Sequence, residues 1–233
     1  MKEPSTPEGF LMLFLDSSDI EAVRTWHSTG TIDGVTTNPS ILRKQGVTNV
    51  EKQISIIAEL IAPQPVAVEI TSADASDVLA ACRRLHAIGP NVVVKIPIVD
   101  ANGSPALSLL HRLHSENIPT NATTCFTVGQ AFLAAKAGAD YVTLFWSRIL
   151  EEGGDAAAIV ASTRRLLNEH ALPARILVGS LRRADDLTQA LLAGAHVVTA
   201  PPELLGRWAD HHYARETAAQ FDADERRRAG LPD

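Results

Sequence analysis

The feature that most constrains the fold is the repeated alternation of short apolar runs with segments of helical spacing. Eight runs rich in β-branched and aromatic residues recur along the chain, at residues 11–16, 33–38, 65–70, 91–97, 118–126, 141–146, 174–180 and 196–201. Most are almost continuously apolar, which is typical of parallel strands that are covered on both faces. Segments with helical periodicity separate them, at residues 20–28, 50–60, 75–88, 106–114, 128–136, 155–170 and 184–192. The pattern therefore predicts repeated βα units.

Eight such units predict an α/β fold of the (β/α)8 TIM-barrel type, because closure of eight strands leaves no sheet edge. A doubly wound open sheet is the alternative. No linker divides the 233 residues, so we expect a single barrel domain over residues 1–233. Residues 1–9 read as a flexible leader. Residues 202–233 read as a charged C-terminal helical extension, which we expect to contact a neighbouring subunit.

Composition excludes several classes of function. The formal net charge of −6 argues against a nucleic-acid partner. No run approaches the roughly 20 apolar residues of a membrane span. Cys82 and Cys125 form no CxxC pair, which fits a reducing cytoplasm, and Cys125 is interpreted as a small buried hydrophobe. The eight histidines form no ligand pattern, so we expect no metal.

Polar residues are concentrated at the carboxyl ends of the predicted strands, the face at which the active site of such a barrel lies. They are Asp16, Thr37, Asn38, Glu69, Lys95, Asn121, Thr123, Arg148, Ser180 and Arg182. The alternation of side chains along a strand predicts that Lys95 and Val93 point into the barrel, and that Glu69 and Ala67 do so as well.

Lys95 is the strongest candidate for chemistry, because it stands inside the most apolar strand of the chain. Burial there disfavours the ammonium form, as an imine-forming nucleophile requires. Asp16 and Glu69 would supply the acid–base groups for imine formation and carbon–carbon cleavage. The structural alternatives are a lysine whose ammonium reaches water and a simple ion pair.

Arg148, Ser180 and Arg182 follow the sixth and seventh predicted strands, near the usual phosphate site of such barrels. Arginine binds phosphate oxygens through paired donors, so we expect these residues to hold a phosphate group. Ordinary surface arginines are the alternative.

Five segments of the sequence resemble the small transaldolases and fructose-6-phosphate aldolases. They are FLDSSDIEAVRTW, GVTTNPSIL, VVVKIP, TNATTCFTVGQAFLAAKAGADYV and GSLR, and the similarity covers about residues 11–205. The combination of TTNPS, VKIP and TNxT is highly specific. The resemblance implies a class I Schiff-base barrel without a cofactor, with the imine on Lys95.

The resemblance also implies roles for the other residues. Asp16 would exchange a proton with the C4 hydroxyl of the substrate, and Glu69, with a water held near Thr123, would serve the imine steps. The substrate-binding residues would be Thr37, Asn38, Asn121, Thr143, Phe145, Arg148, Ser180 and Arg182. A pentameric or decameric homo-oligomer is implied as well.

Two positions distinguish the branches of the family. Aldolases carry glutamine on the third strand and tyrosine on the sixth, whereas this chain has Glu69 and Phe145 and so resembles transaldolases. The predicted activity is transfer of a three-carbon dihydroxyacetone unit from a ketose phosphate, such as fructose 6-phosphate or sedoheptulose 7-phosphate, to an aldose phosphate, as in the pentose phosphate reactions of carbohydrate metabolism. The alternatives are cleavage that releases dihydroxyacetone, a phosphosugar-binding protein without catalysis, and a pyridoxal-phosphate enzyme. Because the Thr143–Arg148 segment departs from the family pattern, we expect Leu144 and Trp146 to reshape the rim of the site.

Overall fold

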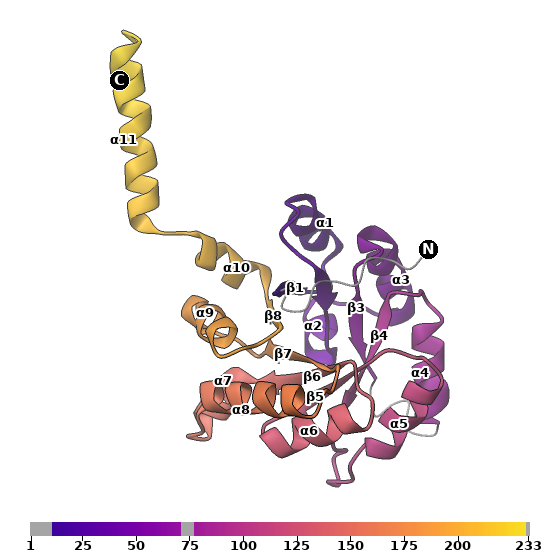
Figure 1. Cartoon of the computed structure of the whole chain (residues 1–233). Coiled ribbons are helices and arrows are strands. Elements are labelled where there is room, and N and C mark those ends of the chain that lie inside the picture. Colours follow the sequence, from indigo (N-terminus) through magenta and orange to yellow (C-terminus); the bar gives the residue numbers. More distant parts are fainter. Residues whose placement is uncertain (1–10, 71–76, 232–233) are drawn as a thin grey trace.

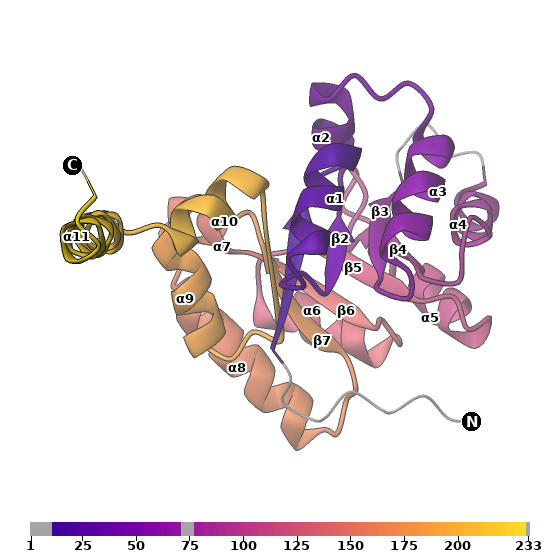
Figure 2. The same cartoon turned by 90° about the horizontal axis from the view of Figure 1, so that it is seen from above.

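Eight parallel strands close a barrel in chain order in this computed structural model, which describes residues 11–70 and 77–231. Figures 1 and 2 show the helices surrounding this barrel. The strands are β1 (Met12–Asp16), β2 (Gly34–Thr36), β3 (Val66–Glu69), β4 (Val92–Pro97), β5 (Thr120–Cys125), β6 (Tyr141–Phe145), β7 (Arg175–Gly179) and β8 (Val197–Ala200). Because β1 pairs with both β2 and β8, the barrel is predicted correctly and the open sheet is wrong.

The alternation predicted from the sequence is present in the two faces of the strands. Ala67 and Val93 belong to a small cluster inside the barrel, with Phe14 and Leu177. The residues that follow them in sequence, Val68 and Val94, join the larger core under the helices. Glu69 and Lys95 are register partners at the carboxyl ends of β3 and β4, so their parity brings both side chains to the barrel mouth.

The helices follow the strands. They are α1 (Ile20–Ser28), α2 (Pro39–Lys44), α3 (Val50–Ile61), α4 (Val78–His86), α5 (Leu107–Ser115), α6 (Val128–Lys136), α7 (Trp146–Glu151), α8 (Ala156–Glu169), α9 (Ala184–Leu192), α10 (Pro202–Ala209) and α11 (His212–Arg228). Several begin with a side-chain cap, such as Asp19 for α1 and Asp155 for α8, which satisfies N–H groups that lack a partner within the helix.

Two short helices at the strand ends were not expected from the sequence. α2 starts three residues after β2, where Asn38 caps it and Pro39 occupies its first turn. α7 begins at Trp146, which the apolar pattern assigns to the preceding strand. The proposed leader, residues 1–9, and the first two residues of the expected helix at 75–88 lie outside the described residues.

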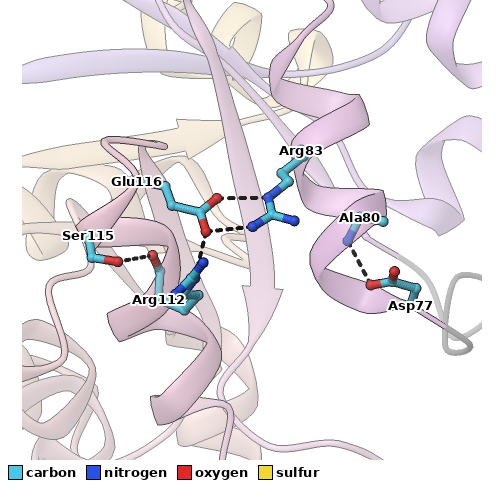
Figure 3. A network of polar contacts seen from close by, with 6 residues as sticks. All are labelled: Asp77, Ala80, Arg83, Arg112, Ser115 and Glu116. Atoms are coloured by element: carbon cyan, nitrogen blue, oxygen red, sulfur yellow. Dashed lines mark hydrogen bonds and ion pairs between the residues drawn. The ribbon is translucent and has the colours of Figure 1, made fainter.

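A surface ion network joins α4 to the end of α5 (Figure 3). Arg83 donates two hydrogen bonds to Glu116, of 2.8 and 2.6 Å, and Arg112 donates one of 2.6 Å to the same carboxylate. The hydrogen bond from Arg83, followed by that from Arg112, lowers the pKa of Glu116 to about 2. The network thus ties neighbouring outer helices together on the side away from the barrel interior.

The C-terminal extension is two helices rather than one. α10 packs beside α9, and its Leu204 and Leu205 are buried. An extended residue, Asp210, ends α10, and α11 then stands away from the barrel in both views (Figures 1 and 2). No residue of α11 is buried. Across the described part of the chain, every helix is too short or too polar to cross a bilayer.

Candidate active site

Lys95 lies inside the barrel on β4, with only 6% of its surface exposed. Its Nζ donates a 2.8 Å hydrogen bond to the backbone carbonyl of Thr37 and lies 3.4 Å from Oε2 of Glu69. Thr37, Glu69 and Lys95 are all among the strand-end residues that the sequence predicts for the site. The amine is therefore almost completely shielded from solvent and has a carboxylate beside it. Proton exchange during imine formation needs this arrangement.

Asp16 ends β1 and shares the electrostatic environment of Lys95 and Glu69. Burial raises the pKa of Asp16, whereas the Lys95 charge and a hydrogen bond from Thr36 lower it, and Glu69 raises it further. The Thr36 hydroxyl donates to Oδ1 of Asp16 over 2.7 Å. Asp16, Glu69 and Lys95 therefore form one cluster, as predicted from their strand-end positions.

Asn38 and Thr37 occupy the end of β2 in ways that the sequence did not specify. The side-chain carbonyl of Asn38 accepts the Ile41 N–H at 3.0 Å and so caps α2, which leaves its amide N–H groups to donate elsewhere. Thr37 contacts Lys95 through its backbone, and its own buried hydroxyl has no protein partner. One short segment thus begins a helix and also carries donors at the barrel mouth.

Asn121 and Thr143 form a buried pair between β5 and β6. Thr143 donates its hydroxyl proton to Oδ1 of Asn121 over 2.6 Å, which fixes the orientation of the amide. Nδ2 of Asn121 and the hydroxyl of Thr123 are buried without protein partners. Buried polar groups are normally satisfied, so these two are positioned for a ligand or a water. Thr124 next to them has a φ of 58°, at a register shift in the β5–β6 pairing.

The two arginines lie at the rim and are exposed. Arg148 on α7 places its guanidinium 5.6 Å from the centre of the Phe145 ring. Arg182 follows β7 and forms an ion pair with Glu151 of α7. Ser180, between β7 and Arg182, has a φ of 57°, a left-handed conformation that is uncommon for serine. The pairing of Arg182 with an acidic residue was not predictable from strand-end position alone.

A cavity of about 430 Å³ opens beside Asp16, lined by the end of β1, the segment that follows β7, β8, and helices α1, α2 and α10. Asp16, Ser180 and Thr199 are among its lining residues.

Within residues 11–70 and 77–231, no three His, Cys, Asp or Glu side chains gather closely enough to hold a metal ion. Cys125 is fully buried, and that burial raises the pKa of its thiol to about 12, as expected for a hydrophobe rather than a nucleophile.

Comparison with known families decides the assignment. The family model described as transaldolase/fructose-6-phosphate aldolase matches residues 13–230. The chain belongs to this family. A probable transaldolase of Thermoplasma acidophilum is 37% identical over 92% of this chain and 95% of the relative. Those of Phenylobacterium zucineum and Caulobacter vibrioides are 35% and 36% identical, each over 92% of this chain and 96% of the relative.

A solved structure supports the fold alone. A mandelate oxidase variant with an FMN adduct superimposes with a TM-score of 0.58 at 13% identity, over 83% of this chain and 64% of that chain.

Two features of this transaldolase-family site differ from what the sequence predicts. Leu144 and Trp146 are 0% and 4% exposed in the core under the helices, so the expectation that they reshape the rim is wrong. Thr36 and Thr199 lie at the site but were not among the candidates. Threonine favours strands generally, and nothing in the apolar pattern separates these two from ordinary strand residues.

Proposed function

We propose that this member of the family is a transaldolase that forms a Schiff base on Lys95. The observation that carries the proposal is the buried Lys95 amine, 3.4 Å from Glu69 and within the electrostatic reach of Asp16. A lysine so deeply buried is rare unless it is paired or functional. Two carboxylates around one amine supply both the pairing and the proton-transfer groups that ketone chemistry requires.

The reaction would begin with attack of the Lys95 nitrogen on the C2 carbonyl of a ketose phosphate. Glu69 carries the proton that the nitrogen gives up to the carbonyl oxygen, which completes the carbinolamine. A second proton, taken up from water and delivered by Glu69, then protonates the hydroxyl, so that water leaves and a protonated imine remains. The unpartnered hydroxyl of Thr123 supports a bound water for this exchange. No cofactor is needed, because the imine itself accepts the electrons of the next step.

Cleavage would then be driven from Asp16. A proton passes from the C4 hydroxyl to the Asp16 carboxylate, C4 becomes an aldehyde, and the C3–C4 bond breaks. Its electron pair forms the C2–C3 double bond of an enamine, while the imine electrons move onto the Lys95 nitrogen. The aldose phosphate leaves, and the three-carbon enamine adds to the aldehyde of a second aldose phosphate by the reverse steps.

Substrate binding would use the groups whose hydrogen bonds are incomplete. The amide donors of Asn38 and Asn121 and the hydroxyl of Thr37 would meet sugar hydroxyls, with Thr143 holding Asn121 in place. Arg148, Ser180 and Arg182 would bind the phosphate at the rim. Phe145, in edge contact with Phe126 and beneath Arg148, would wall this region.

A borohydride experiment tests the Schiff base. Reduction in the presence of fructose 6-phosphate should add a three-carbon or six-carbon unit to Lys95, detected by peptide mass spectrometry. An unmodified Lys95 would favour a phosphosugar-binding protein without catalysis, and visible absorbance of the purified protein would favour a pyridoxal-phosphate enzyme.

A comparison of rates tests transfer against aldol cleavage. Glu69 and Phe145 support transfer, so donor consumption should depend on the acceptor aldose phosphate. Equal rates of donor cleavage with and without acceptor, with free dihydroxyacetone as product, would contradict the transaldolase proposal and support the aldolase alternative.

We also propose a homo-oligomer, pentameric or decameric, in the cytoplasm. α11 has no buried residue, and its Tyr213 and Phe221 are 64% and 67% exposed, which is unfavourable unless another surface covers them. The two cysteines are buried and form no disulfide bond with each other, which is compatible with a reducing compartment. Light scattering of the intact chain tests the assembly, and a monomer at micromolar concentration would contradict it.

A further inference from the structure

A line of hydrogen bonds crosses the inside of the barrel from β8 to β1. The hydroxyl of Thr199 on β8 lies 2.6 Å from that of Thr36 on β2, and Thr36 in turn donates to Oδ1 of Asp16 over 2.7 Å. Thr36 and Thr199 are 1% and 5% exposed. In the sheet register Thr36 pairs with Asp16 and Thr199 with Phe14, so the two threonines approach β1 from its two neighbours.

The number of protons on the two hydroxyls decides which group donates in each of these hydrogen bonds. A threonine hydroxyl has one proton, and that of Thr36 is used by the carboxylate of Asp16, which can only accept when it is ionised. The proton in the 2.6 Å contact must therefore come from Thr199. Two hydrogen bonds aligned in this way polarise each other, so that donation from Thr199 strengthens donation from Thr36.

We propose that Thr199 is a positioning residue for Asp16, acting through Thr36. The two threonines keep Oδ1 of Asp16 occupied and hold the carboxylate at a fixed angle. Oδ2 is then the oxygen that exchanges the proton with the substrate C4 hydroxyl. This role rests on the function proposed above, and it adds a residue that touches Asp16 only through an intermediary.

The charged groups that face Asp16 make the role measurable as a pH effect. Lys95 approaches from β4 and Glu69 from β3, and Asp19, Lys44 and Glu203 line the cavity beside Asp16. All of them remain when Thr199 is replaced. Burial raises the pKa of Asp16 and the Thr36 hydrogen bond lowers it. A weaker Thr36 bond therefore raises that pKa, and since Asp16 must be ionised to accept a proton, the acid limb of activity moves to higher pH.

The test compares Thr199→Val, which keeps the shape, with Thr199→Ser, which keeps the hydroxyl. Thr120→Val is the matched control, because Thr120 is in register with Val94 on the helix side of the barrel wall, and its buried hydroxyl has no protein partner. For Thr199→Val we expect kcat for transfer to fall about 2- to 10-fold, the range for one hydrogen bond, with KM little changed and the acid limb at higher pH. Thr199→Ser should keep the wild-type kcat and the wild-type acid limb, and Thr120→Val should leave both quantities unchanged.

A double-mutant cycle isolates the path. If Thr199 acts through Thr36, adding Thr199→Val to Thr36→Val should change kcat no further than Thr36→Val alone. An acid limb in Thr199→Val that coincides with the wild type, or additive losses in the cycle, would overturn the role of Thr199. Should Thr199→Val fail to fold, Thr199→Ala is subject to the same prediction.

Different results would exclude the Schiff-base function and the positioning role of Thr199. A wild-type chain that forms no borohydride adduct on Lys95 removes the proposed function and the role of Thr199 together. A wild type that is trapped and active, with an unmoved acid limb in the Thr199 variants, removes only the role of Thr199.

Discussion

The ion pair between Arg182 and Glu151 gives a quantitative test of phosphate binding. The two side chains are 59% and 51% exposed, so water screens their attraction and the pair contributes about 0.2–1 kcal/mol. An arginine that binds a phosphate oxygen instead gains about 1.5–3 kcal/mol from a hydrogen bond to a charged group. Glu151 is therefore expected to compete weakly with the substrate for Arg182.

These values set the size of two opposite effects. Arg182→Ala loses the phosphate contact but no longer gives up the Glu151 pair, a net loss of about 0.5–2.8 kcal/mol, or about 2- to 100-fold in kcat/KM. Glu151→Gln removes the competitor, and should improve kcat/KM for phosphorylated sugars by about 1.4- to 5-fold. Glu152→Gln is the control, because it removes the same charge from the neighbouring residue.

The assay is steady-state kinetics with a ketose phosphate and with the matching unphosphorylated ketose, together with inhibition by inorganic phosphate. Both changes should appear only with the phosphorylated substrate, and the inhibition constant for phosphate should follow them. Equal losses of Arg182→Ala on phosphorylated and free sugars would show that Arg182 does not bind phosphate. A Glu151→Gln variant with a higher KM would show that the ion pair holds Arg182 in its binding position.

Three further predictions concern the catalytic lysine and the fold. Lys95→Ala should abolish turnover but leave inorganic phosphate binding, measured by calorimetry, nearly unchanged, whereas loss of phosphate binding would place the lysine in the anion site. Gly34→Ala should destabilise by about 1–3 kcal/mol in urea unfolding, because its Cβ would lie 2.7 Å from the Phe14 ring, and Gly206→Ala, with open space around it, should not. Burial, with nearby arginine charges, lowers the pKa of His196 from 6.5 to about 4, so the unfolded chain binds more protons between those values and stability should fall as pH drops from 7 towards 4. His196→Asn should flatten that fall, and an unchanged slope would rule out this histidine as its source.

The barrel could be predicted from the sequence because the spacing of apolar residues distinguishes its strands from its helices. Val93 and Lys95 share a face because side chains alternate along any strand, and closure of eight units then brings Lys95 and Glu69 to one rim. The Asp16–Glu69–Lys95 cluster follows from these rules alone.

What the sequence could not provide depends on contacts between residues distant in the chain. The pairing of Arg182 with Glu151 is set by where α7 ends, and the first residue of α7, Trp146, belongs to a run that reads as strand. Thr199 lies far along the chain from Thr36, and its role depends on which hydroxyl faces which. The break between α10 and α11 at Asp210 also could not be predicted, because no glycine or proline marks it in the sequence.

The pairing of β1 with β8 has a consequence for the order of events during synthesis. These strands form the most sequence-distant contact of the barrel, and a contact of that kind forms late because a long loop must be closed first. Lys95, Glu69 and Asp16 are all translated before β8 is complete, yet the hydroxyl of Thr199 reaches Thr36 only when the last strand docks. A nascent chain with seven strands therefore holds the nucleophile without its full proton-transfer geometry, and activity should appear in one step with ring closure.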